Sequence, residues 1–376
     1  MRKEVKMNNA GYGNYAKLIA FFLVAALLVV GFGFATEGWW QIEAPNTQNN
    51  KQNNENKIDI PASGGNSADP PSEPEPYIPE HVNLLTGEEV DEETARKRHY
   101  AFVLDPSAPL YGISSASLVA EFPTESGSTR LVSFINNSSE LSKIGSLTPT
   151  RSYISNVAKF FASILVADGN DGKLKYDRCD TTGSFLDVSQ HQGYCYTEYV
   201  QFKYTNGDLI DAGIYNINLN TTLTKDTQIP YQFTDFGKEL DQKGFSAESV
   251  IIPHSSKSET ELYYSRTSKT YSFNKNGVPK SDMLNDKKVG FKNIFILFTD
   301  TMTYEGTAST EMVMNTIGSG TGYYLSNGVG QSLTWESDVS GSLTFYDESG
   351  SKLTVNRGNS YLGFVKSAKT SDIKIS

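Results

Sequence analysis

Residues 291–300 read Phe-Lys-Asn-Ile-Phe-Ile-Leu-Phe-Thr-Asp and carry the strongest strand pattern in this chain of 376 residues. Shorter strand patterns continue from there to Val365. Asn-Gly pairs indicate hairpins, because these two residues readily adopt the positive φ angles of a tight turn. The second half of the chain is therefore predicted to be mostly antiparallel β. Its hairpin signals and one earlier signal are Asn276-Gly277, Asn327-Gly328 and Asn206-Gly207.

The segment before this run mixes strands with a helix. Strand patterns cover residues 99–105, 118–122 and 129–135, and a short helical turn is expected at 113–117. Residues 152–164 have helical spacing, with one apolar face formed by Tyr153, Val157, Phe160, Phe161 and Ile164.

These patterns predict an α+β protein in two halves. The N-terminal half, residues 79–235, is expected to be mixed α/β. The C-terminal half, residues 236–376, is expected to be mostly antiparallel β.

The N-terminus predicts a single membrane span. Residues 1–17 carry four basic side chains against one glutamate, and an unbroken apolar run extends from Leu18 to Ala35. A helix of that length covers roughly 27 Å, close to the thickness of the hydrocarbon layer. Aromatic anchors, Trp39 and Trp40, follow directly.

Because the positive charges precede the apolar run, we expect residues 1–17 in the cytoplasm and a transmembrane helix at 18–36. The remainder would then lie outside the cytoplasm, anchored in the cell membrane. A cleaved signal peptide is the alternative. Residues 37–78 are rich in Asn, Gln, Pro, Ser and Glu, so they predict a disordered linker between the membrane and the folded part.

The charge balance argues against nucleic acid as a partner. The net charge is −10 and the basic residues form no cluster, whereas phosphate backbones require basic patches. Acidic residues gather at 88–93, which we interpret as a solvated helix start.

Two cysteines, Cys179 and Cys195, are present. In an oxidising compartment they could form one disulfide that closes a short loop, and two free thiols are the alternative. A metal site that adds His191 fits no zinc spacing, so no metal and no cofactor are predicted.

Two glycine-rich stretches resemble ligand loops without their context. Gly318–Gly322 could cradle a phosphate, but no helix follows it, and we expect a tight bend between strands. Residues 168–172, Asp-Gly-Asn-Asp-Gly, lack the Gly and Glu spacing of a calcium loop, so a turn is expected, with calcium as the alternative.

Arg130 and Arg151 are candidate ligand-binding residues. Their planar guanidinium groups suit carboxylate or phosphate capture, and Arg151 opens the predicted helix, where a cation opposes the helix dipole. Glu121 and Glu125 could perform acid–base chemistry or bind a ligand. The alternative for all four is an internal ion pair or an ordinary surface role.

A series of motifs resembles the YerB family of Gram-positive envelope proteins, usually described as lipoproteins with a two-part domain of unknown function. The resemblance covers roughly residues 79–366 and implies an extracytoplasmic location but no established reaction. The motifs are LTGEE at 85–89, RHYAFVLD at 98–105, VAEFPTESGSTRL at 119–131, RSY at 151–153, NIFILFTDTMTY at 293–304, TIGSGTGYY at 316–324, LTW at 333–335 and FYDESG at 345–350.

The chain also departs from the family pattern. Ser117 stands where members typically carry an acidic residue, and residues 166–170 read Val-Ala-Asp-Gly-Asn in place of a His-Ala-Gly-Gly-Ser-like stretch. A membrane span replaces the lipid anchor, because no cysteine lies near the apolar run.

Together these observations predict a non-enzymatic protein of the cell envelope. Its expected partners are the membrane and either peptidoglycan or another envelope protein. The alternative is an enzyme that acts on cell-wall material or its precursors.

Overall fold

The computed structural model describes residues 77–139, 141–170, 183–190, 193–198, 201–303 and 312–376. The expected cytoplasmic segment, transmembrane helix and nearly all of the linker lie outside these ranges. Among the described residues, no helix is long and apolar enough to cross a membrane. Tyr77 and Ile78, the end of the expected linker, are 63% and 80% exposed.

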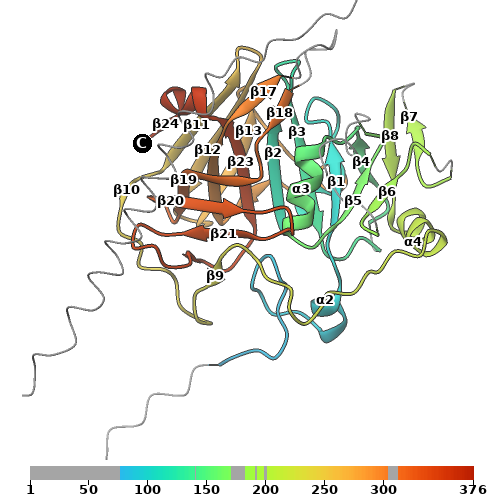
Figure 1. Cartoon of the computed structure of the whole chain (residues 1–376), viewed down its shortest axis with the longest axis horizontal. Helices are drawn as coiled ribbons and strands as arrows, with labels where there is room; N and C mark the ends of the chain where they lie inside the picture. Colours follow the sequence, from blue (N-terminus) through green and yellow to red (C-terminus); the bar gives the residue numbers. More distant parts are fainter. Residues whose placement is uncertain (1–76, 140, 171–182, 191–192, 199–200, 304–311) are drawn as a thin grey trace, which may run out of the picture. The chain divides into compact units, whose positions relative to one another are not determined.

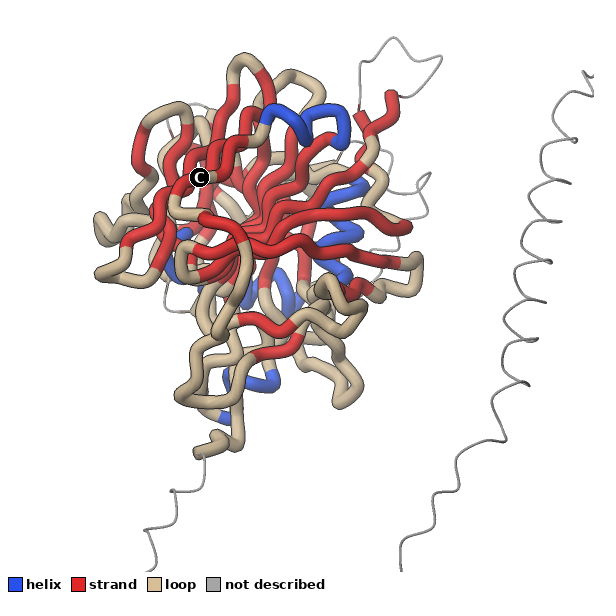
Figure 2. Tube along the Cα trace, turned by 90° about the vertical axis from the view of Figure 1, so that its left-hand side faces the viewer, coloured by secondary structure: helices blue, strands red, loops and turns tan. Residues whose placement is uncertain are grey.

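One fourteen-stranded sheet dominates the described residues (Figures 1 and 2). Along its main path the strands are β10 (Phe245–Ser246), β20 (Val329–Ser337), β19 (Gly318–Ser326), β16 (Asn293–Thr299), β23 (Ser360–Lys366), β2 (Leu118–Pro123), β3 (Thr129–Ile135), β1 (Tyr100–Leu104), β4 (Ile144–Leu147), β8 (Phe202–Thr205) and β7 (Tyr196–Glu198). Off this path, β21 (Leu343–Tyr346) pairs with β20, and β5 (Ile164–Ala167) pairs with both β1 and β6 (Phe185–Asp187).

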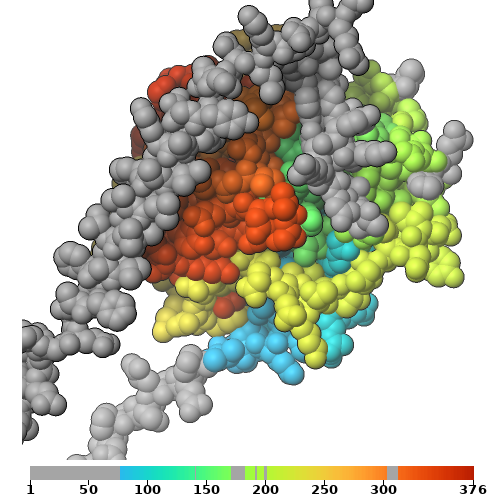
Figure 3. All heavy atoms as spheres, in the orientation of Figure 1, coloured from blue at the N-terminus to red at the C-terminus, as the bar shows by residue number. Residues whose placement is uncertain are grey.

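Strand β23 joins the two halves of the chain within this sheet. It pairs in parallel with β2, from Leu118 opposite Ser360 to Glu121 opposite Gly363. On its other side it pairs in parallel with β16. Figure 3 shows green atoms of the first half beside orange atoms of the second on one face of the molecule. The expected boundary near residue 235 stays a prediction, but the sheet itself runs across it.

A second sheet of six strands and two short strand pairs complete the β structure. In the second sheet β11 (Ser249–Ser255), β12 (Ser258–Ser265) and β13 (Thr270–Lys275) are antiparallel neighbours. The remaining strands are β14 (Val278–Pro279), β15 (Gly290–Phe291) and β24 (Lys374–Ile375) in that sheet, and the pairs β17 (Thr301–Thr303) with β18 (Met312–Met314) and β9 (Gln232–Phe233) with β22 (Thr354–Val355).

The central strands of the large sheet are buried on both faces. Successive side chains of a strand point to opposite faces, and in β16 all seven residues are buried. Ile294 and Ile296 belong to the core that includes Val250 and Phe273 of the second sheet. Phe295 and Leu297 belong to the core that includes Tyr153 and other residues of α3.

Few helices are present. Figure 1 shows α3 over one face of the sheet beside β1 and β2. The predicted helix at 152–164 is confirmed but is shorter than expected: it ends at Phe160, Ala162 adopts a φ of 50°, and Ile164 begins β5. Among the described residues, the helices are α2 (Glu92–Arg96), α3 (Ser152–Phe160) and α4 (Gly207–Asn216), and the 3-10 segments are η1 (Ile113–Ser115) and η2 (Ser367–Asp372).

The predicted hairpin turns are confirmed at two Asn-Gly pairs, and the prediction is wrong at the third. Asn276-Gly277 and Asn327-Gly328 form hairpin turns with φ angles of 51° and 75°, and 53° and 77°. Asn206 instead caps α4, because its side chain accepts a hydrogen bond from Leu209 N at 2.9 Å. An Asn side chain satisfies a free backbone N–H at a helix start as readily as it favours a turn.

The glycine-rich stretch 318–322 is a strand, not the expected bend. It begins β19 and pairs with β20 along its whole length. A Cβ at Gly322 would lie 2.2 Å from the carbonyl oxygen of Ile296, and one at Gly320 would lie 2.7 Å from the Trp335 ring. The glycines therefore allow close approach of a neighbouring strand and an indole.

Taken together, the described residues form a mostly β protein with few helices, which is compatible with the α+β class.

Candidate functional site

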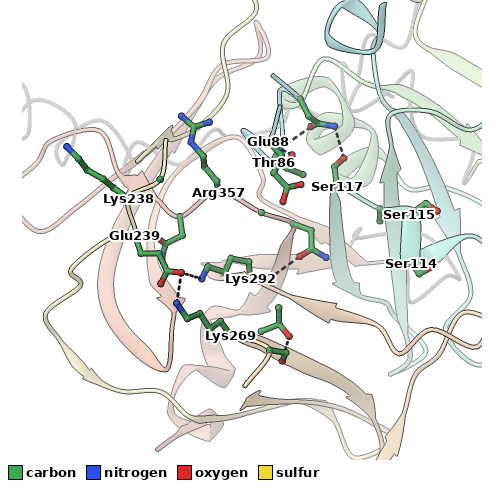
Figure 4. A pocket seen from close by; sticks show the side chains of 18 residues that line it. Thr86, Glu88, Ser114, Ser115, Ser117, Lys238, Glu239, Lys269, Lys292 and Arg357 are labelled. Atoms are coloured by element: carbon green, nitrogen blue, oxygen red, sulfur yellow. Dashed lines mark hydrogen bonds and ion pairs between the residues drawn. The ribbon is translucent and has the colours of Figure 1, made fainter. Parts of the chain in front are cut away.

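A polar pocket of about 760 Å³ lies where segments from both halves of the chain meet. Figure 4 shows Thr86, Glu88 and Ser117 on one side and Lys238, Glu239, Lys269 and Lys292 on the other. We call it the junction pocket. It is lined by Asn83, Thr86, Glu88, Ser114, Ser115, Ala116, Ser117, Gly237, Lys238, Glu239, Ser268, Lys269, Thr270, Lys292, Asn356, Arg357, Gly358 and Asn359.

The wall from the first half is a tight turn held by one amide. Asn83 Oδ1 accepts hydrogen bonds from Leu85 N at 2.9 Å and Thr86 N at 3.1 Å, the pattern of an Asx turn. Its Nδ2 donates to Ser117 Oγ at 3.2 Å, which ties the turn to the start of β2.

The opposite wall carries a cluster of charges. Glu239 Oε1 accepts hydrogen bonds from Lys269 Nζ at 3.0 Å and Lys292 Nζ at 3.4 Å. Its Oε2 accepts one from Asn327 Nδ2 at 2.8 Å. The pKa of Glu239 lies below its ordinary value because Lys269 donates to the carboxylate and the charge of Lys292 adds to the effect.

Arg357 connects the two walls through backbone carbonyls. Its Nε donates to Thr234 O at 3.0 Å and its Nη1 donates to Gly87 O. The guanidinium carbon lies 3.7 Å from the centre of the Phe236 ring. Burial lowers the pKa of Arg357, and the nearby charge of Asp235 opposes this shift.

The pocket has an excess of positive charge. Four cationic side chains (Lys238, Lys269, Lys292 and Arg357) and two carboxylates (Glu88 and Glu239) line it, although the chain as a whole has a net charge of −10. A third carboxylate, Asp235, lies outside the lining and pairs with Lys238 at 3.0 Å. Hydroxyl and amide side chains make up most of the remaining lining, and no aromatic ring belongs to the described lining. Such a surface suits a hydrophilic anion.

One serine of the pocket wall contacts a histidine behind it. Ser117 Oγ lies 3.2 Å from His99 Nε2, and His99 is fully buried. Burial lowers the pKa of His99 to about 3, so the ring is neutral at ordinary pH. A base with so low a pKa removes a serine proton poorly.

Glu121, one of the predicted site residues, is fully buried and paired away from the pocket. Its Oε1 accepts from Lys275 Nζ at 2.5 Å, and its Oε2 accepts from Thr260 Oγ1 at 2.6 Å and Tyr361 OH at 2.7 Å. His254 Nε2 lies 3.5 Å from Oε2. This contact set holds β2, β12, β13 and β23 together, and the ion-pair partner of Glu121 is Lys275 rather than Arg130 or Arg151.

The other three predicted residues lie together at the end of the β2–β3 hairpin and the start of α3. Arg151 Nη2 donates to Glu125 Oε1 at 2.5 Å, so these two form an ion pair. Burial and the charge of neighbouring Arg151 lower the pKa of Arg130. Arg130 Nη1 is buried without a hydrogen-bond partner in the described part of the chain. A ligand-binding role for these residues stays a prediction.

The remaining sequence candidates have structural partners or lie outside the described ranges. Asp168 Oδ1 accepts from Lys203 Nζ at 2.5 Å, so this carboxylate of the considered calcium loop is already paired. Cys195 Sγ donates a hydrogen bond to Val188 O at 3.7 Å. Cys179 and His191 are not among the described residues, so the disulfide stays a prediction.

Sequence reasoning missed the junction pocket entirely. Its charged residues lie in five separate segments, and each lysine taken alone resembles an ordinary surface residue. The only local signal is Lys292, a charged residue that directly precedes the buried strand β16.

Comparison with known proteins identifies the family. The chain belongs to the YerB-like family of DUF3048 proteins, which is described as a family of proteins of unknown function. The model of the family's N-terminal domain matches residues 85–211, and the model of its C-terminal domain matches residues 250–362. The resemblance seen in the sequence is thereby confirmed. Residues of both matched ranges line the junction pocket.

The fold is also that of a solved structure. The crystal structure of the YerB protein from Bacillus subtilis superposes with a TM-score of 0.67 at 18% sequence identity, over 78% of this chain and 99% of that one. At this identity the likeness concerns the fold. No curated protein matches the chain in sequence.

Proposed function

We propose that this chain is a non-enzymatic binding protein of the cell envelope and that the junction pocket binds an anionic cell-wall polymer. The observation that carries the proposal is the positively charged, hydroxyl- and amide-rich pocket on an otherwise acidic protein. Its volume of about 760 Å³ lies within the range of about 300–1,000 Å³ that is common for small-molecule sites. Recognition would rest on hydrogen bonds and charge rather than on ring stacking.

The envelope location is part of the proposal. It is supported by the apolar run from Leu18 to Ala35, by the basic residues before it and by the two tryptophans after it. Protease added to intact, wall-stripped cells should digest the region after residue 77 and leave residues 1–17 protected. Protection of both regions would contradict this topology.

Cosedimentation with purified peptidoglycan sacculi tests the binding. The full chain in mild detergent should bind saturably, and binding should weaken as salt rises because exposed charges are screened. Lys292→Ala should lose binding, because Lys292 supplies a mostly buried ammonium group to the pocket. Lys257→Ala, a change at an exposed turn outside the pocket, is the matched control and should bind like the wild type.

Absence of binding above a control protein would contradict the wall-polymer proposal. Crosslinking in cells would then identify an envelope protein as the partner, the second class of partner expected from the sequence.

An enzyme acting on wall material is the second candidate, and one contact favours it. Ser117 Oγ and His99 Nε2 are 3.2 Å apart at the pocket wall. The low pKa of His99 weighs against it. Incubation with soluble muropeptides should leave them unchanged, whereas turnover that Ser117→Ala abolishes would establish the enzyme.

A further inference from the structure

Glu239 occupies the junction pocket in the manner of a bound ligand. Its two carboxylate oxygens accept hydrogen bonds from two ammonium groups and one amide, namely Lys269, Lys292 and Asn327. Figure 4 shows Lys269 and Lys292 converging on this carboxylate. A carboxylate or phosphate on a ligand would be held by the same donors.

Lys292 is fixed in place before any ligand arrives. Its side chain is 13% exposed, and its Nζ also donates to Asn327 Oδ1 at 2.7 Å. Its backbone N donates to Asn359 O at 3.0 Å, and a Cβ at Gly358 would lie 2.8 Å from Lys292 Cβ. Gly358, with a φ of 129°, therefore allows the Lys292 side chain to pack flat against the loop before β23. Positioned charges bind anions without a large ordering cost.

Glu239, in contrast, has a more exposed side chain than Lys292, although the backbone N of the following residue, Leu240, donates to Asn356 Oδ1 at 2.7 Å. The Glu239 and Lys269 side chains are 46% and 57% exposed. Ion pairs between exposed groups contribute little to stability, because water solvates both partners well. Glu239 also lies in the irregular segment between β9 and β10, which contains no helix or longer strand to hold it.

We propose that Lys269 and Lys292 form the anion subsite of the junction pocket and that Glu239 fills this subsite until a ligand's own anionic group displaces it. The inference rests on the proposed function in that it concerns the same pocket. It adds the class of ligand, a hydroxyl-rich molecule that carries a carboxylate or phosphate. It also adds an internal competitor, Glu239, which raises the ligand concentration needed for binding.

Calorimetric titration of the full chain in mild detergent tests this inference. The probes are glycerol 3-phosphate, glucuronate and, as the neutral control, glucose. Glu239→Gln removes the competing charge but keeps the side-chain shape. It should tighten binding of the anionic probes roughly tenfold, because Lys269 and Lys292 are then available to the ligand without first losing the Glu239 carboxylate. Glu336→Gln, at an exposed position of β20 outside the pocket, should leave affinity unchanged.

The two anionic probes separate the two sources of the anion. Stronger gain for glycerol 3-phosphate assigns the subsite to phosphate, and stronger gain for glucuronate assigns it to carboxylate. Lys292→Met should abolish binding of both, and its thermal unfolding should show that the variant is folded.

Several results would overturn the inference. Glu239→Gln could bind the anions no better than the wild type, glucose could bind as well as the anions, or neither protein could bind an anion. Each result is independent of the sacculus assay. Anion binding with the expected Glu239 effect but no sacculus binding would retain the subsite and reject the wall polymer.

Discussion

Glu121 of β2 and Lys275 of β13 form an ion pair of 2.5 Å with side chains that are 0% and 5% exposed. The pair links the large sheet to the second sheet, between positions 154 residues apart in the chain. Tyr361 and Thr260 donate to the same carboxylate, so its hydrogen-bonding capacity is largely used. A buried charge is tolerated only with such compensation.

Loss of one partner of this pair should be costly. Glu121→Gln leaves the Lys275 ammonium buried without its countercharge, and we expect the free energy of unfolding to fall by about 3–5 kcal/mol. Urea denaturation followed by circular dichroism measures it. Glu336→Gln, at an exposed position, is the control and should change it by less than about 0.5 kcal/mol. A double variant, Glu121→Gln/Lys275→Met, should regain part of the lost free energy of unfolding. If Glu121→Gln were as stable as the wild type, the ion pair would not stabilise the fold as described.

The same pair should make stability depend on acid. Burial alone would raise the pKa of Glu121, but Lys275 and His254 outweigh it and hold the pKa well below 4.5. A depressed carboxyl pKa stabilises the folded state fully above the unfolded value and loses its effect as pH falls through the folded value. The stability difference between wild type and Glu121→Gln should therefore be constant from about pH 6 to 8 and shrink below about pH 4.5. A difference that grows on acidification would contradict the sign.

The strand glycines should tolerate no side chain. In Gly322→Ala the new methyl group would meet the Ile296 carbonyl of the neighbouring strand at 2.2 Å. Backbone of a central strand cannot move aside locally, so the variant should lose at least about 1–3 kcal/mol of stability. The neighbouring exposed Ser319→Ala is the matched control. Thermal unfolding of the Gly322→Ala and Ser319→Ala variants tests this prediction. Equal melting temperatures of the two variants would show that the sheet can accommodate the methyl group.

The junction pocket and the Arg130–Arg151 pair give opposite expectations in the sacculus assay. Neither arginine lines the pocket, so folded Arg130→Ala should bind sacculi like the wild type while Lys292→Ala does not. Loss of binding in Arg130→Ala alone would move the wall-facing site to the arginine pair predicted from the sequence.

Cys195 should react slowly with alkylating reagents after reduction. Burial raises the pKa of its thiol, so little reactive thiolate exists at pH 8. Iodoacetamide labelling followed by peptide mass analysis should show slower modification than of free cysteine, with the rate rising with pH. Labelling without prior reduction tests the predicted disulfide with Cys179, because a bonded Cys195 takes up no reagent at all.

The sequence supported correct predictions where one strand or turn is decided by its own residues. The apolar run 291–300 and the strands at 99–105, 118–122 and 129–135 follow from local alternation or burial, and two Asn-Gly turns follow from backbone preference. Gly322 shows where this fails, because its role depends on a strand that precedes it by more than twenty residues.

Side chains whose role depends on distant partners were not predictable. Glu121 lies in a strand whose other residues are buried, yet a glutamate in a sequence carries no mark of the lysine that will pair with it. Lys269 and Lys292 likewise acquire meaning only through Glu239, which a separate loop supplies. The sequence indicated the Arg151–Glu125 region because an arginine opposes the dipole at a helix start, and it missed the junction pocket, whose lysines carry no such local signal.

The place of β23 between β2 and β16 also sets an order of events during synthesis. A chain is made from its N-terminus, but 240 positions separate Glu121 of β2 from Tyr361 of β23. Until β23 is made, β2 has an unpaired edge, and exposed strand edges recruit strands of other chains. The vulnerable species is thus the incomplete chain rather than the finished one. A stop upstream of Ser360 would leave a product that aggregates although nearly all of its strands are present.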